Sequence, residues 1–205
     1  MARTRMLILV AGVVALAVVG VAVWASAQCC GLPAAAPARK PAEAQVTSTT
    51  PFQVLDVTGP AKGQEVCYIC RYGGRPSLAV FTRTMEGHFP EIARAVEQFV
   101  AENRKQRAAG FVVLLGENTK TNREALVKVA DDHKLSIPLT IALDGPKGPK
   151  SYNLNGEFDT LVLVGHRNKV HSSFALRCIA NKCEGKPCAR TDEIVAAAER
   201  MLDEI

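Results

Sequence analysis

Two short apolar runs flank one long amphipathic segment in the middle of the chain. Residues 78–81 (LAVF) and 111–115 (FVVLL) are apolar at every position, as in strands that are covered on both faces of a sheet. Between them, apolar side chains recur at helical spacing, at Phe89, Ile92, Ala93, Val96, Phe99 and Val100. This pattern predicts two parallel central strands joined by a helix, which is a β-α-β crossover.

The segment before the crossover predicts a β-hairpin. Residues 52–58 alternate between apolar and polar side chains, and residues 65–72 form a second β-rich run. The glycine-containing residues 59–63 separate the two runs and predict the turn.

The segment after the crossover predicts a helix, a strand, a second hairpin and a last helix. Residues 121–124 fit the capping box S/T-x-x-E, which opens a helix, and residues 137–143 form a short apolar run. Residues 160–177 predict a hairpin that turns near Asn168, because asparagine tolerates the left-handed backbone conformation. Thr191 or Asp192 is expected to cap the last helix.

The N-terminus has the pattern of a secretory signal. Arg3 and Arg5 precede an uncharged run over residues 6–24, and the small residues 25–27 (ASA) form a cleavage site. We expect residues 1–27 to be a signal peptide. An uncleaved membrane anchor through residues 6–24 is the alternative, since the run is just long enough to span a bilayer.

Every interpretation of this N-terminus exports the rest of the chain, to the periplasm of a bacterium or to the extracellular space. Cys29 or Cys30 as the acylated cysteine of a lipoprotein is a third interpretation with the same result. Residues 28–51 are rich in Ala and Pro without apolar periodicity, which predicts a tether. The folded domain is expected to span residues 52–205.

Composition and charge exclude some classes of function. The formal net charge is +5, and the chain has neither a block of Lys and Arg nor a stripe of basic and aromatic residues, so we expect no nucleic-acid partner. It also has no glycine-rich nucleotide-binding pattern and no recognisable hydrolytic triad. We assign no cofactor and no metal ligands.

The order of the predicted elements is that of a thioredoxin fold. In detail the chain resembles the alkyl hydroperoxide reductase/thiol-specific antioxidant branch, which includes peroxiredoxins and membrane-tethered thioredoxin-like proteins. The matching segments are residues 52–56, 59–63, 65–69, 74–81 and 161–170. The resemblance covers about residues 52–205. It implies an α/β domain with a central mixed β-sheet flanked by helices, an N-terminal β-hairpin and a C-terminal helix.

The chain departs from this branch at the expected active site. The resemblance places the reactive cysteine where the first crossover strand ends and the next helix begins, which corresponds to residues 82–90. This segment contains no cysteine, and His88 is its one group that titrates near neutral pH. Asp159 stands where the resemblance implies a cis-proline before the late strand.

A C-x-x-C motif lies one predicted strand earlier, at Cys67 and Cys70. On an extended strand their Cα atoms would be about 10 Å apart, beyond the limit of about 7 Å for a disulfide. Either the chain bends, for which Gly73 and Gly74 just beyond are suited, or each cysteine pairs elsewhere. A redox-active pair, structural disulfides, metal ligands and buried free thiols remain alternatives.

The C-terminal third holds further candidates. Cys178, Cys183 and Cys188 lie in a Cys-rich loop, residues 178–188, which we interpret as stapled by disulfides in an exported protein. A zinc site drawn from the five cysteines of the domain is the alternative. An Asn168-Lys169 loop would place His166 opposite His171, and without a third ligand we interpret them as an exposed polar pair.

Two functions are compatible with these features. In the first, Cys67 and Cys70 exchange with the thiols or disulfides of protein partners, one sulfur attacking and the other resolving, as in a thiol-disulfide oxidoreductase or a peroxiredoxin-like antioxidant. In the second, the domain has lost catalysis and serves as a binding or scaffold module with structural disulfides.

Overall fold

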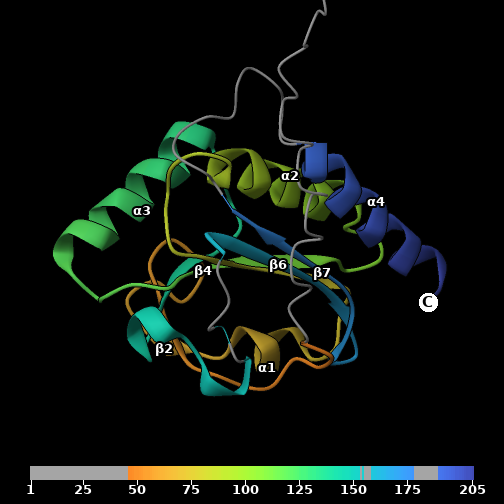
Figure 1. Ribbon diagram of the computed structural model, residues 1–205, viewed down its shortest axis with the longest axis horizontal. Helices are drawn as coiled ribbons and strands as arrows, with labels where there is room; N and C mark the ends of the chain where they lie inside the picture. The colour runs from red at the N-terminus through yellow and green to blue at the C-terminus, as the bar shows by residue number, and fades with distance from the viewer. Residues whose placement is uncertain (1–45, 153, 155–157, 178–188) are drawn as a thin grey trace, which may run out of the picture. The chain divides into compact units, whose positions relative to one another are not determined.

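The computed structural model describes residues 46–152, 154, 158–177 and 189–205, without the side chains of residues 189 and 190. Within these residues seven strands form one mixed sheet in the order β2-β1-β5-β4-β3-β6-β7 (Figure 1). The strands are β1 (Val54–Asp56), β2 (Glu65–Val66), β3 (Ser77–Thr82), β4 (Ala109–Leu114), β5 (Leu139–Ala142), β6 (Thr160–His166) and β7 (Lys169–Leu176).

The predicted β-α-β crossover is confirmed. Strands β3 and β4 are parallel neighbours in the middle of the sheet, with Val80 opposite Val112, and helix α2 (Phe89–Glu102) connects them. The helix buries the side chains that share its apolar face, namely Phe89, Ile92, Ala93, Val96 and Phe99. The expected fold class, a central mixed sheet with an N-terminal hairpin and a C-terminal helix, is observed.

Helices cover both faces of the sheet. On one face α2, α3 (Lys120–His133) and α4 (Ala189–Asp203) pack onto the sheet (Figure 1). On the other face the short helix α1 (Tyr68–Tyr72) packs with the 3-10 turns Gly145–Lys147 and Lys150–Tyr152 nearby. The core beneath α1 contains most of the buried aromatic side chains, namely Tyr68, Phe81, Phe111, Tyr152 and Phe158.

The predicted second strand over residues 65–72 is wrong. Only Glu65–Val66 pairs with β1, and the chain then turns into α1. Cys67 caps the N-terminus of this helix with its sulfur, and Gly73 ends the helix in the left-handed conformation at φ 59°. Local capping therefore overrides the β-rich composition of this run.

Both predicted helix caps are also displaced. The capping side chain of α3 is Thr119, whose hydroxyl accepts a hydrogen bond from Asn122 N at 3.1 Å, rather than Thr121. Helix α4 begins at Ala189, so Thr191 and Asp192 lie within its first turn.

The second hairpin turns one residue earlier than the Asn168-Lys169 loop. Arg167 and Asn168 occupy the turn with φ of 51° and 62°, and His166 pairs with Lys169. A register shift between Val164 and Gly165 then leaves His171 without a directly opposite partner on β6. The expected His166–His171 pairing is therefore wrong.

Residues 47–49, which fall in the segment that the sequence assigns to the tether, bind the outer edge of β7. Thr49 N donates to Asn168 O at 2.8 Å, and Val170 N donates to Thr47 O at 3.0 Å. Among the described residues, none of the helices combines the length and apolar character needed to cross a membrane.

Candidate functional site

A disulfide joins Cys67 to Cys70, with their Cα atoms 5.3 Å apart. The bend after β2 brings the two cysteines close enough for the bond to form, because Cys67 has an extended backbone and the next residue starts the helix. Cys70 N also donates a hydrogen bond to Cys67 Sγ at 3.1 Å. Of the alternatives left open by the sequence, the structure contains the local pair.

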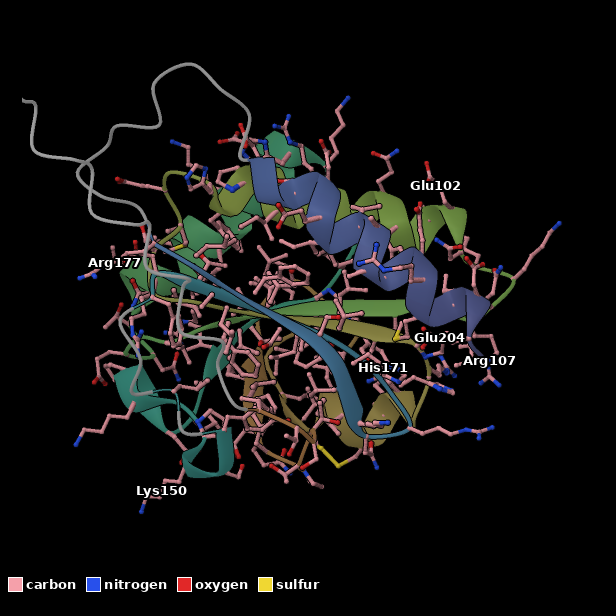
Figure 2. All side chains as sticks on the ribbon, turned by 45° about the vertical axis from the view of Figure 1, so that its right-hand side comes forward. Glu102, Arg107, Lys150, His171, Arg177 and Glu204 are labelled. Carbon is pink, nitrogen blue, oxygen red and sulfur yellow. A yellow bond between two sulfur atoms is a disulfide. The ribbon has the colours of Figure 1, made fainter. Side chains whose placement is uncertain are left out.

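The two linked sulfurs differ in exposure. Cys67 is only 9% exposed and belongs to the apolar core beneath α1, whereas Cys70 is exposed. In Figure 2 the bond between the two sulfurs is the yellow stick beside α1, at the lower surface of the molecule. A partner in solution can therefore approach Cys70 but not Cys67.

Tyr68 anchors the start of α1 to the sheet. Its hydroxyl donates to Asp56 Oδ2 at 2.7 Å, and its ring stacks on Phe111 with the ring centroids 5.6 Å apart. Asp56 is itself 1% exposed and accepts two more hydrogen bonds, from Gly59 N and Ala61 N, each at 2.7 Å. The carboxylate thus ties the first hairpin to the residue that follows Cys67.

Tyr72 anchors the other end of α1. Its hydroxyl donates to Gly110 O at 3.0 Å, and its ring meets Phe111 edge-on at 5.9 Å between centroids. The two tyrosines therefore hold both ends of the helical turn that carries the disulfide. This anchoring fixes Cys67 inward and Cys70 outward.

Burial raises the pKa of both α1 tyrosines well above the ordinary value, and the hydrogen bond to Asp56 raises that of Tyr68 further. The charges of Arg71 and Arg75 act in the opposite direction on Tyr72. Burial also raises the pKa of Tyr152 to about 12, although hydrogen bonding with the backbone and side chain of Thr50 lowers it.

These shifts predict loss of stability at alkaline pH. The folded protein keeps phenolic protons that the unfolded chain releases above pH of about 10. The stabilisation is therefore complete below that pH and is lost as the pH rises through the raised pKa values of the tyrosines in the folded protein. Urea unfolding at pH 8 and pH 11 should show the decrease. Between these two pH values the free energy of unfolding of Tyr152→Phe should fall by about 1 kcal/mol less than that of the unmodified protein. An equal fall in the two proteins would contradict the prediction.

The end of α1 contacts the turn of the second hairpin. Arg167 N donates to Gly74 O at 2.9 Å, and a Cβ atom on Gly74, whose φ is +78°, would lie 3.3 Å from Arg167 Cα. Nearby, His171 Nδ1 lies 3.8 Å from Glu204 Oε2 at the end of α4 (Figure 2). Two segments that are distant in sequence thus meet beside the disulfide-bearing helix.

Residues 82–90, which the family resemblance assigns to the active site, contain no cysteine and make contacts within the domain instead. Thr82, the last residue of β3, places its hydroxyl 3.1 Å from that of Thr160 on β6. Arg83 donates to the carbonyl oxygens of Leu154 and Phe158, and its guanidinium lies 4.3 Å from the centre of the Phe158 ring. Arg83 therefore fastens the segment before β6 to the end of β3, where the resemblance implied a reactive cysteine.

Several sequence candidates do not enter this site. Cys29, Cys30, Cys178, Cys183 and Cys188 lie outside the described residues. Leu176 at the end of β7 pairs with Thr160, which pairs with Thr82, so β7 does end beside the family's usual site. In the part of the chain that the structure describes, no three His, Cys, Asp or Glu side chains gather as metal ligands.

A groove of about 540 Å³ lies between β1 and α3, away from both sulfurs. Apolar side chains from Leu55, Val57 and Val127 line it together with charged side chains from Lys62 and Asp131, among others. Neither cysteine lines this groove, so it is not part of the disulfide site.

Known proteins resemble this chain in fold and not in sequence. No family model matches the chain. No curated protein sequence matches it significantly. Solved structures do match over most of the described domain. The chain has a thioredoxin-like fold.

Three of the similar structures show the range of this likeness. The thioredoxin domain of a thiol-disulfide oxidoreductase from Bacteroides vulgatus is 10% identical, with 76% of this chain and 96% of that chain covered and a TM-score of 0.55. AhpC from Mycobacterium tuberculosis is 10% identical, with coverage of 77% and 98% and a TM-score of 0.53. A secreted disulfide oxidoreductase from Mycobacterium tuberculosis is 11% identical, with coverage of 73% and 95% and a TM-score of 0.50.

The C-x-x-C spacing indicates both cysteines of the disulfide, but the residues that support it have no such pattern. Asp56 ends an alternating strand and gives no local sign of its burial, and Tyr68 looks like an ordinary strand residue. Arg83 is exposed, as most arginines are, so the sequence gives no sign of its contacts with Leu154 and Phe158.

Proposed function

We propose that this thioredoxin-like protein is an exported thiol-disulfide oxidoreductase that uses the Cys67–Cys70 disulfide. The difference in exposure between the two linked sulfurs carries the proposal. Exchange needs one sulfur that a partner can reach and a second that leaves and later returns. Cys70 meets the first requirement, and Cys67 meets the second.

In the reduction half of the reaction, a partner thiolate attacks Cys70 Sγ. A mixed disulfide forms between the partner and Cys70, the Cys67–Cys70 bond breaks, and Cys67 leaves as a thiolate. The backbone N–H of Cys70, 3.1 Å from Cys67 Sγ, is placed to stabilise the negative charge that develops there. A second partner thiolate then attacks the partner's sulfur in the mixed disulfide and releases Cys70 as a thiolate, which leaves both cysteines reduced.

The size of the loop also supports a redox role over a purely structural one. The two cysteines are three residues apart in sequence, so the bond closes a very small loop. In the chain-entropy description such a bond stabilises the fold by only about 2 kcal/mol. The tyrosine anchors and the sheet contacts hold α1 without it, so opening the disulfide leaves the fold in place.

Export belongs to the proposal because of the N-terminal signal in residues 1–27 and the resulting oxidising environment. A membrane tether through residues 6–24 is compatible with the same chemistry. Protein thiols and disulfides are the expected partners.

The competing function is a binding or scaffold module without catalysis. Residues 82–90 favour the scaffold module, because the segment at which the resemblance implies a reactive cysteine contains none. Arg83 in this segment instead binds Phe158 within the domain. The two functions differ in whether the Cys67–Cys70 bond turns over.

Turnover can be measured on the full-length protein with dithiothreitol and insulin. We expect the protein to accelerate insulin reduction. We also expect the tryptic peptide of residues 63–71, which holds both cysteines, to change from the bridged to the alkylated mass under mild reductant. The double variant Cys67→Ser with Cys70→Ser should lose the acceleration.

The matched control replaces the three cysteines of the 178–188 loop by serine and should keep the activity. A bridged peptide that resists mild reductant, or insulin reduction that survives in the double variant, would refute the oxidoreductase proposal and favour the scaffold module.

A further inference from the structure

A group of positive side chains lies beside Cys70. We call Arg71, Arg75, Arg167 and Lys169 the basic rim. Arg71 directly follows Cys70 and is exposed, and Arg75 lies three residues after the end of α1. Both guanidinium groups are close enough for their charges to act on Tyr72.

The hairpin turn adds the other two members of the basic rim. The hydrogen bond from Arg167 N to Gly74 O fixes the turn against the loop between α1 and β3. The close approach of Gly74 to Arg167 Cα leaves the exposed Arg167 and Lys169 at the same end of the sheet as Arg75. Charges from two segments almost one hundred residues apart therefore gather around one end of α1.

The basic rim is not neutralised within the described residues. None of its four side chains forms an ion pair there, and the ion pairs Lys120–Glu124 and His171–Glu204 involve other side chains. Asp56 lies behind Tyr68, is buried, and accepts three hydrogen bonds from other groups. An exposed sulfur next to unpaired cations attracts anions, because surface charge raises the local concentration of oppositely charged ligands.

We propose that the basic rim selects anionic thiol partners, in which carboxylates or other acidic groups flank the sulfur that attacks Cys70. This proposal rests on the proposed function and names its substrate class. The physical effect is on the encounter and on the approach of the negatively charged thiolate to Cys70. Salt therefore weakens this attraction, with a screening length of about 10 Å at 0.1 M.

The test compares three small thiols as reductants of the oxidised full-length protein. They are 2-mercaptoethanesulfonate, 2-mercaptoethanol and cysteamine, whose second groups are negative, neutral and positive. Because their thiolates also differ in intrinsic nucleophilicity, each rate is referred to that of the same thiolate with a neutral small disulfide. The opening of the Cys67–Cys70 bond is followed by quenching with an alkylating agent and mass analysis, and each rate is divided by the thiolate concentration. We expect the sulfonate to react on the order of tenfold faster than cysteamine at low salt, and the difference to vanish at about 0.5 M salt, at which screening is nearly complete.

A variant pair assigns the effect to the basic rim. Arg71→Gln, Arg75→Gln and Arg167→Gln together should abolish the preference for the anionic thiol. The control changes Arg94, Arg123 and Lys128 to Gln, which removes the same charge from helices on the opposite face, and should keep the preference. Thermal unfolding of both variants shows whether they are folded, and the salt dependence of the unmodified protein tests the proposal without any variant.

The outcomes separate this proposal from the proposed function. If all three thiols open the bond at equal rates per thiolate at low salt, or if the basic-rim variant keeps the preference, selection by charge is refuted and the oxidoreductase remains. If no thiol opens the bond, the proposed function itself fails, and the substrate class fails with it.

Discussion

Cys67→Ser should leave Cys70 as a thiol that attacks a small disulfide on the order of tenfold faster than Cys67 does in Cys70→Ser. The reason is burial, since Cys67 is 9% exposed and packs in the core beneath α1. Cys70 is exposed, so its sulfur reaches a disulfide in solution without rearrangement of the helix. Cys67 Sγ also accepts the hydrogen bond from Cys70 N, which favours its thiolate, so the expected order of rates requires burial to outweigh that advantage.

Both variants are expected to keep the helical turn. Serine is a good N-cap residue, so in Cys67→Ser the introduced hydroxyl can accept the hydrogen bond from Cys70 N that Cys67 Sγ now accepts. Cys70→Ser leaves the sulfur cap in place. The comparison therefore reports on access to the sulfur and not on unfolding of α1.

The measurement is the rate of mixed-disulfide formation with 5,5′-dithiobis(2-nitrobenzoate), with the labelled position read from the peptide that contains residues 67 and 70. The double serine variant gives the background from the other cysteines. Equal rates, or faster reaction at Cys67, would reverse the roles and make Cys67 the attacked sulfur.

Asp56→Ala is expected to lower the free energy of unfolding by about 3 kcal/mol. Its carboxylate accepts hydrogen bonds from Gly59 N, Ala61 N and the Tyr68 hydroxyl, each at 2.7 Å. The substitution removes the acceptor of the buried Tyr68 hydroxyl and of the two half-buried amides, and each unsatisfied buried group has a cost of its own.

Urea unfolding of Asp56→Ala and Tyr68→Phe measures this effect. Tyr68→Phe removes one of the three hydrogen bonds and keeps the ring on Phe111, so it should cost only about 1 kcal/mol. We also expect Cys67 to become more reactive towards alkylation in reduced Asp56→Ala, because the anchor of the next residue is lost. If Asp56→Ala lowers the free energy of unfolding by less than Tyr68→Phe does, Asp56 does not hold the first hairpin to α1.

Local patterns were sufficient for the framework of the fold. The apolar runs at 78–81 and 111–115 identified β3 and β4, since only strands covered on both faces are apolar at every position. The helical repeat from Phe89 to Val100 identified α2, and the cysteine spacing identified the pair at the candidate site. Each of these signals is a repeat or a spacing within about twenty residues, which the chain carries without reference to its partners.

The tertiary structure decided how the cysteine pair is presented. The β-rich run at 65–72 bends into a helical turn because the sulfur of Cys67 caps the start of the helix, Gly73 ends it, and Tyr68 and Tyr72 find partners at Asp56 and Gly110. Composition favours a strand here, and contacts to residues that are distant along the chain outweigh it.

The same holds for the basic rim and for the site that the family resemblance predicted. Arg71 follows Cys70 in the chain, whereas Arg167 joins the basic rim only when the hairpin turn docks on Gly74. Arg83 closes the end of β3 only when Leu154 and Phe158 come within reach. Sequence by itself determined most of the strands and helices, α1 excepted, because those depend on periodicity. Burial, exposure and the grouping of charges depend on which segments the sheet brings together, and only the folded chain decides that.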